Sequence, residues 1–103
     1  MLRKRRFADV IARQLDLFVR DQLELLEACD AAERAYDRSE RGEAEERYGD
    51  YQDLVETGTE ILAELRDNFR ATLDEDTVEE YDAEFNRAVR KRLPRFALEI
   101  EEL

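Results

Sequence analysis

Carboxylates are the most abundant side chains that could do chemistry in this chain of 103 residues, which has 28 Asp and Glu and no His. Helical-bundle sites for iron or manganese combine inward-facing Glu with His, because imidazole and carboxylate together satisfy the metals. The acids Glu56, Glu60, Glu64 and Asp67 recur at helical spacing, but they fall on the outer face of their predicted helix. We therefore expect a solvated acidic face here and no metal site.

The sequence also has few residues that could carry out nucleophilic catalysis. Cys29 is the single cysteine, it shares a predicted inner helix face with Ala28 and Ala32, and no His is present to activate it. A Ser-His-Asp triad is excluded for the same reason, and the sequence has no glycine-rich phosphate loop. The sequence predicts a packed core thiol at Cys29, no catalytic residue, no cofactor and no enzymatic activity.

Two basic clusters interrupt the acidic composition, one at residues 3–6 and one at residues 87–95. The net charge of −11 disfavours general binding to nucleic acid, because the chain repels polyphosphate at long range. Either the clusters pair with acidic side chains of this chain or of a second copy, or they contact an anion locally. The second interpretation rests on Arg87, Arg90, Lys91 and Arg95.

Three tyrosines, Tyr36, Tyr48 and Tyr51, lie on the two sides of a predicted turn between helices. One interpretation is aromatic packing near the turn, with the hydroxyls in water. The other is a pocket for a small ligand or a peptide, lined by the three rings. The sequence leaves both open.

The elements that position these residues are predicted to be helices, because the chain has three Gly, one Pro and 44% charged residues. Unbroken apolar periodicity predicts helices over about 5–38, 43–73 and 77–93, and a helical tail over about 95–102 that is kinked or restarted after Pro94. Gly42 and a polar segment near 74–77 mark the turns. Short turns predict an all-α fold of one domain over residues 1–103, an antiparallel up-down-up three-helix bundle with a long helical hairpin.

Two features of the predicted inner faces stand out, a glycine and a group of polar side chains. Gly58 points inward in mid-helix, where glycine costs about 1 kcal/mol relative to alanine, and this favours a close helix approach over a hinge. Gln14 lies with Asp21 and Gln22 within or beside the apolar face of the first helix. They are predicted to form a polar layer that fixes helix register, and the alternative is a ligand contact or an acid–base group.

The first part of the first helix has an unusually wide apolar face, about 240° of its circumference, whereas residues 28–36 cover about 120°. The wide part needs neighbours on two sides, which predicts a homodimer through this helix and a larger, coiled-coil-like helical bundle. The predicted interface residues are Val10, Leu15, Leu17, Val19, Leu23 and Leu26.

The composition also predicts the cellular compartment and the salt concentration in which the protein works. A lone cysteine indicates a reducing, cytoplasmic setting, and charged residues interrupt every apolar run that could serve as an export signal or a membrane span. An acid-rich surface with two lysines against fifteen arginines suits a high-salt cytoplasm, so a halophilic source is expected.

We find no motif diagnostic of a known family. The sequence is best explained as a small acidic helical-bundle protein without enzymatic activity, acting as an interaction or accessory module through homodimerisation or with another protein. Two alternatives stay open, a small nucleic-acid-associated regulator that uses clusters 3–6 and 87–95, and an aromatic-lined ligand-sensing bundle.

Overall fold

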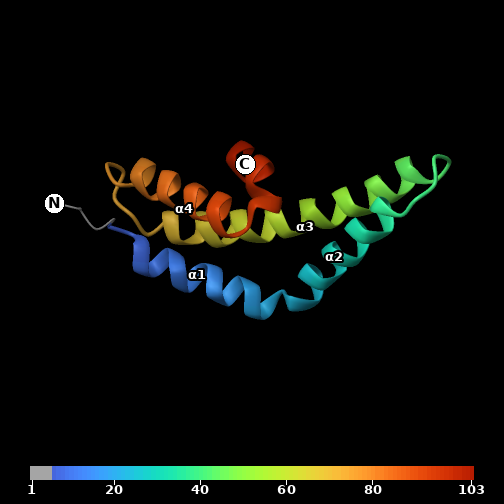
Figure 1. Cartoon of the computed structure of the whole chain (residues 1–103). Coiled ribbons are helices and arrows are strands. Elements are labelled where there is room, and N and C mark those ends of the chain that lie inside the picture. The colour runs from blue at the N-terminus through green and yellow to red at the C-terminus, as the bar shows by residue number, and fades with distance from the viewer. Residues whose placement is uncertain (1–5) are drawn as a thin grey trace.

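The computed structural model describes residues 6–103, and every regular element in that range is a helix (Figure 1). The elements are α1 (Ala8–Asp21), α2 (Leu23–Asp37), α3 (Ala44–Arg70), α4 (Val78–Arg92), the 3₁₀ turn η1 (Pro94–Phe96) and α5 (Ala97–Glu102). The predicted all-α class is confirmed. Within 6–103, no helix combines the length and the apolarity that a membrane span requires.

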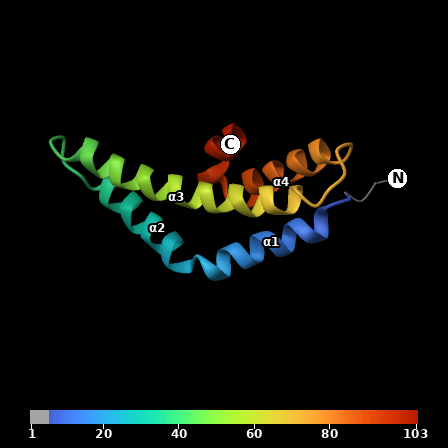
Figure 2. The ribbon, with the colours of Figure 1, turned by 180° about the vertical axis from the view of Figure 1, so that it is seen from behind.

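Helix α3 is the spine of the molecule. Helices α1 and α2 follow one another along it, α4 returns along its C-terminal half, and α5 lies near its middle (Figures 1 and 2). The molecule is elongated, with extents of 52 × 26 × 24 Å. We call residues 23–57, which comprise α2 and the first half of α3, the arm. The body comprises residues 6–22 and 58–103.

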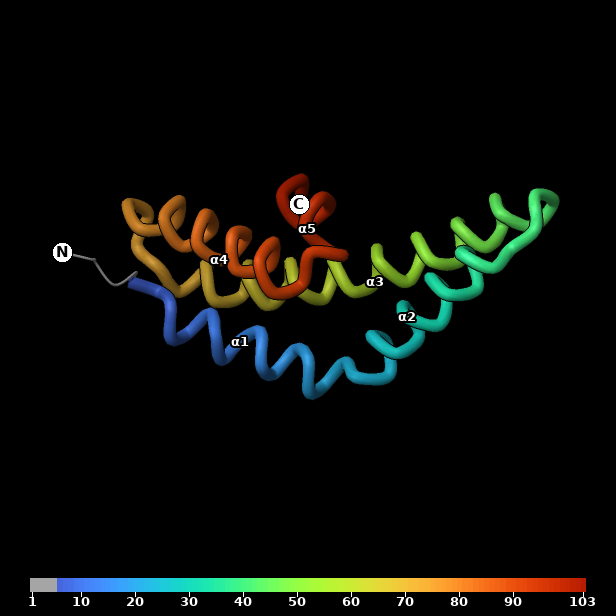
Figure 3. Tube along the Cα trace, viewed as in Figure 1, coloured from blue at the N-terminus to red at the C-terminus, as the bar shows by residue number. Residues whose placement is uncertain are grey.

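A single helix over residues 5–38 is wrong, because the chain bends at Gln22, which separates α1 from α2 (Figure 3). Gln22 has φ −112° and ψ 28°, outside helical geometry, although no Gly or Pro lies nearby. The bend has a tertiary reason: α1 packs against α4, whereas α2 packs against the arm portion of α3. The predicted start at Arg5 lies outside the described residues, and α1 begins at Ala8.

The wide apolar face of α1 finds neighbours on two sides within the chain itself. The buried side chains of α1 are Ile11, Leu15 and Phe18, and Phe7, just before the helix, is buried with them. The Phe7 ring meets Tyr81 of α4 edge-on with centroids 5.3 Å apart, and meets Phe69 of α3 at 6.4 Å. The need for neighbours that the sequence indicated is therefore met largely inside one molecule.

A polar bridge crosses this core at Gln14. The Tyr81 hydroxyl donates to Gln14 Oε1 at 3.0 Å, and Gln14 Nε2 donates to the Leu65 carbonyl at 3.3 Å, so that α1, α3 and α4 are joined. The polar role predicted for Gln14 is confirmed. Asp21 instead lies exposed and pairs with its neighbour Arg20.

The C-terminal segment restarts as a separate helix, as the sequence allowed. Helix α4 ends at Arg92, and Leu93 (φ −132°, ψ 60°) leaves the helical region, as a residue before proline tends to do. The turn η1 then brings Phe96 onto α3 at Gly58, where the missing side chain leaves room for the ring. The close approach predicted at Gly58 is thus made by an aromatic ring rather than by a second long helix.

Arg66 of α3 holds α5 against the rest of the body, a role that the sequence did not reveal. The residue is only 3% exposed, and its Nη1 donates to Asn86 Oδ1 at 3.1 Å and to the Ile100 carbonyl at 3.0 Å. A guanidinium supplies several donors at once, so one residue of α3 joins α4 and α5.

Gly58→Ala should lower the free energy of unfolding by on the order of 1–3 kcal/mol, because the new Cβ would fall against Phe96 Cε1 and 2.8 Å from Phe96 Cζ. Phe96 is 1% exposed and packs edge-on against Phe18, so its ring has little room to move. The matched control is Gly49→Ala, which meets nothing within 4 Å and should stabilise the protein by about 0.5–1 kcal/mol. Urea unfolding measures both; a stabilising Gly58→Ala would contradict the close approach.

Tyr81 should make the fold sensitive to alkali. Burial raises the pKa of Tyr81 from 10.0 to about 12. The unfolded chain therefore loses this proton first as the pH rises above 10, and the stability that depends on it is full below pH 10 and is lost towards pH 12.

Comparing Tyr81→Phe with the wild type in urea at several pH values tests this. The variant should be less stable by about 1 kcal/mol at pH 8, because Gln14 Oε1 loses its donor. The difference should shrink between pH 10 and pH 12. Tyr48→Phe, at an exposed ring, is the control, and a difference that stays constant with pH for Tyr81→Phe would refute the assignment.

Candidate functional site: the groove between α1 and α4

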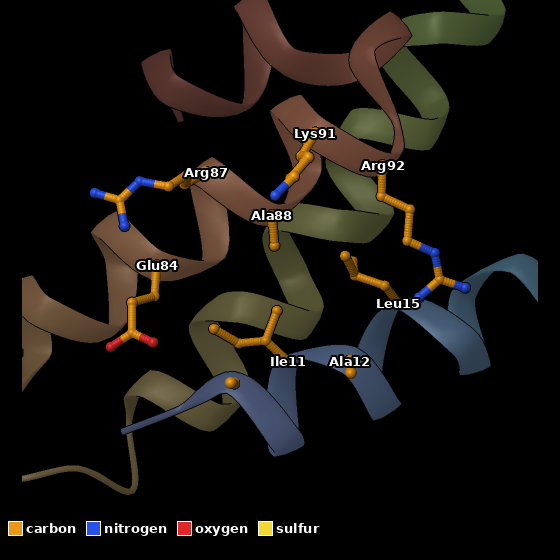
Figure 4. A pocket seen from close by; sticks show the side chains of 9 residues that line it. Ile11, Ala12, Leu15, Glu84, Arg87, Ala88, Lys91 and Arg92 are labelled. Carbon is orange, nitrogen blue, oxygen red and sulfur yellow. The ribbon is translucent and has the colours of Figure 1, made fainter. Parts of the chain in front are cut away.

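The candidate site is a groove between α1 and α4 with a volume of about 380 Å³ (Figure 4). Its floor is apolar and its rim is charged. The floor residues are Ala8, Ile11, Ala12 and Leu15 of α1 and Ala88 of α4, and the rim residues are Glu84, Arg87, Lys91 and Arg92 of α4. The groove exists because α1 and α4 present alanines where they face each other, so small side chains leave space between the two backbones.

Two of the four rim charges are engaged within the chain. Arg92 Nη2 lies 2.5 Å from Asp16 Oδ1 of α1, which ties the two walls together at one end. Glu84 Oε1 accepts the Phe7 N–H at 3.3 Å near the other end. Within residues 6–103, Arg87 and Lys91 have no carboxylate oxygen within 4.0 Å. The rim therefore presents two cationic groups whose charge the fold leaves uncompensated at contact distance.

The cationic residues predicted as one anion contact are dispersed. Arg87 and Lys91 line the groove, but Arg90 pairs with Glu101 of α5 at 3.2 Å, and Arg95 faces the arm. Of the first cluster, residues 3–5 lie outside the described part of the chain, and Arg6 Nε lies 3.6 Å from Glu80 Oε2. This arrangement does not favour a basic surface for nucleic acid.

Arg95 is a structural clamp between η1 and the arm. Its Nε donates to the Tyr51 hydroxyl at 3.1 Å, and its Nη2 lies 2.9 Å from Asp30 Oδ1 and 3.2 Å from Glu33 Oε1. Burial alone lowers the pKa of Arg95, but the hydrogen bonds with Tyr51 and Asp30 outweigh it and hold that pKa above its usual value. The Arg95 side chain is 19% exposed, so the guanidinium is committed to these partners.

The three tyrosines divide between two environments. Tyr36 and Tyr48 pack on each other at the end of the arm, with ring centroids 5.4 Å apart, and remain 39% and 47% exposed. Tyr51 instead accepts the hydrogen bond from Arg95 and lines a recess of about 360 Å³ with residues 92–96. The structure supports the packing interpretation for Tyr36 and Tyr48.

Cys29 is fully buried, as predicted, and burial raises the pKa of its thiol. This disfavours the thiolate that nucleophilic chemistry needs. The outward acids Glu56, Glu60, Glu64 and Asp67 are all exposed. No group of three or more potential metal ligands exists in the part of the chain that the structure describes.

The six predicted interface residues fall into three classes of exposure. Leu15 is 1% exposed and belongs to the core, which corrects its assignment to an interface. Val10, Val19 and Leu26 are partly buried against that core. Leu17 and Leu23, on either side of the bend at Gln22, are 39% and 54% exposed. The physical reason for the correction is that α4 covers the side of α1 that the sequence left open.

Comparisons with protein families, with curated proteins and with solved structures find no match to this chain.

Arg95→Gln should lower the free energy of unfolding by about 1–2 kcal/mol, because three partners on the arm lose a largely buried charged donor. Arg90→Gln is the matched control, since its ion pair with Glu101 is largely exposed, and it should cost less than about 1 kcal/mol. Urea unfolding gives both values. Thiol labelling of Cys29 under native conditions should be faster in Arg95→Gln, and equal labelling rates would refute the clamp.

Proposed function

We propose that this protein is a non-catalytic interaction module that works as a homodimer. The observation that carries the proposal is the open shape of the single chain. Its radius of gyration is 15.8 Å, against about 13 Å for a compact domain of this length. The excess comes from the arm, which is two helices thick and in which Cys29 and Val55 are the buried residues.

A two-helix arm gains stability from a further layer, because two helices share one seam and leave both sides of it partly open to water. The half-buried small side chains along that seam, Ala28, Ala32, Ala35 and Ala44, fit this description. A second copy is the partner that the chain itself supplies, and symmetric dimers are the commonest assemblies.

The contact is proposed to centre on the bend, where Leu17 and Leu23 are the exposed leucines of α1 and α2. Completing the burial of each would contribute about 1 kcal/mol, so four leucines in a symmetric dimer would contribute about 4 kcal/mol. That sum only reaches the lower end of the association cost of about 4–15 kcal/mol. The interface must therefore also include the partly buried residues beside them, such as Val10 and Val19.

Charge makes this association dependent on salt. Each copy has a net charge of −11, so two copies repel each other until counterions screen them. The dimer is therefore expected to be favoured by the high-salt cytoplasm that the composition suggests.

The test is the molar mass from light scattering behind a sizing column, at about 0.1 M and about 2 M KCl. The expected mass at high salt is about 24 kDa, twice the chain mass of 12.2 kDa, with a smaller dimer fraction at low salt. The double variant Leu17→Asp and Leu23→Asp should be monomeric and folded by circular dichroism.

Leu98→Asp is the matched control, because Leu98 of α5 is 85% exposed and lies outside the proposed contact. It should remain dimeric. A wild-type mass near 12 kDa at both salt concentrations would refute the homodimer, and equal effects of the two sets of substitutions would refute the contact at the bend.

A further inference from the structure

The groove between α1 and α4 has the dimensions of a small-molecule site rather than of a helix-binding site. Its volume of about 380 Å³ lies within the range of about 300–1,000 Å³ for ligand pockets. Along α1 the floor extends from Ala8 to Leu15, which is about 10 Å at the rise of a helix. A partner helix is about 10 Å across with its side chains, too wide for this volume. An apolar chain of medium length matches both dimensions.

The charged residues at the rim of the groove determine which charge the head group of such a ligand should have. Arg87 and Lys91 lie one turn apart on α4 and therefore share a face. The C-terminal end of a helix favours cations, which accounts for residues 90–92 but not for Arg87, a full turn earlier. In a chain of net charge −11, two cations without a contacting carboxylate within the described residues, beside an apolar floor, are complementary to an anionic amphiphile.

The engaged rim residues give the ligand an orientation. Arg92 is held by Asp16, and Glu84 keeps a negative charge near the Phe7 end of the groove. An anionic head is repelled from Glu84 and attracted towards Lys91, so the apolar chain would extend over Ile11 towards Ala8. In Figure 4 the Arg87 side chain points away from Lys91, and as an exposed side chain it can turn towards a bound anion at little cost.

We propose that the groove between α1 and α4 binds a small anionic amphiphile, with a carboxylate head at Lys91 and Arg87 and an apolar chain along Ile11, Ala12 and Ala88. This site does not depend on the proposed homodimer, since the groove is complete within one chain. Nucleic acid is a poorer fit, because a phosphate backbone has no apolar chain for the floor.

The experiment titrates three probes into the full chain by calorimetry at about 0.1 M salt. Decanoate, kept below its micelle concentration, has both the charge and the chain; decyltrimethylammonium has a similar chain with the opposite charge; acetate has the head alone. Saturable binding is expected for decanoate, with acetate silent and decyltrimethylammonium at least tenfold weaker. Decanoate should also raise the unfolding temperature.

Two variants locate the site. Arg87→Gln with Lys91→Gln should weaken decanoate binding at least tenfold, and Ala12→Trp, at an exposed position, should block the floor without disturbing the core. The matched control is Arg38→Gln with Arg41→Gln, which changes the net charge equally at exposed positions before α3. It should bind decanoate within about twofold of wild type at this ionic strength.

Three results would overturn the site: no saturable decanoate binding, unchanged binding after Arg87→Gln with Lys91→Gln, or equal binding of decanoate and decyltrimethylammonium. The monomeric variant Leu17→Asp with Leu23→Asp separates the two proposals, because it should lose the dimer and keep decanoate binding. Its loss of binding alongside dimer loss would refute a groove complete in one chain.

Discussion

The contact between Phe96 and Gly58 is the interaction on which the arrangement of this protein depends. Because Gly58 has no side chain, the Phe96 ring lies directly on α3 at the junction of the body and the arm. That position sets η1 across the junction and carries Arg95 within reach of Asp30 and Glu33 on α2. The same turn places α5 against α3 and α4, where Arg66 donates to the Ile100 carbonyl. One absent methyl group thus determines where the last ten residues of the chain lie.

Most of the arginines near the junction of the body and the arm form ion pairs between helices. Arg92 and Arg95 reach from the end of α4 and from η1 to acids on α1 and α2, so several cations of an acidic chain are used to hold the outer helices. Among residues 6–103, Arg87 and Lys91 do not hold helices together in this way. The groove beside them is apolar, and the carboxylate at its rim, Glu84, already accepts a hydrogen bond from the Phe7 N–H. The groove therefore follows from how the fold uses the neighbouring charges, and its cations would not stand out from the sequence alone.

The open arm gives the molecule two regions with different energetics. In the body, Tyr81 contacts Phe7, Phe69 and Phe85 in one aromatic cluster, with Gln14 bridging three helices. In the arm, small side chains and the exposed pair Tyr36 and Tyr48 leave a thin seam between two helices. The arm has the least self-burial, so it is the part of the chain most suited to gain stability from a partner, and the proposed dimer contact lies at its junction with the body.

Local periodicity and backbone chemistry are enough to predict the helical class, the turns near 38–43 and 71–77, and the inward positions of Gly58 and Cys29. They also predict an interruption at Pro94, but they leave open whether the helix is kinked there or restarts. Long-range packing, by contrast, sets the bend at Gln22, the place of Leu15 in the core, the contact of Arg95 with the arm and the groove beside Arg87 and Lys91. A wide apolar face says that a helix needs neighbours, but it does not say whether they come from the same chain. The answer lies in long-range packing: α4, some seventy residues later, returns to cover α1, and that contact leaves no trace in the local pattern of either helix.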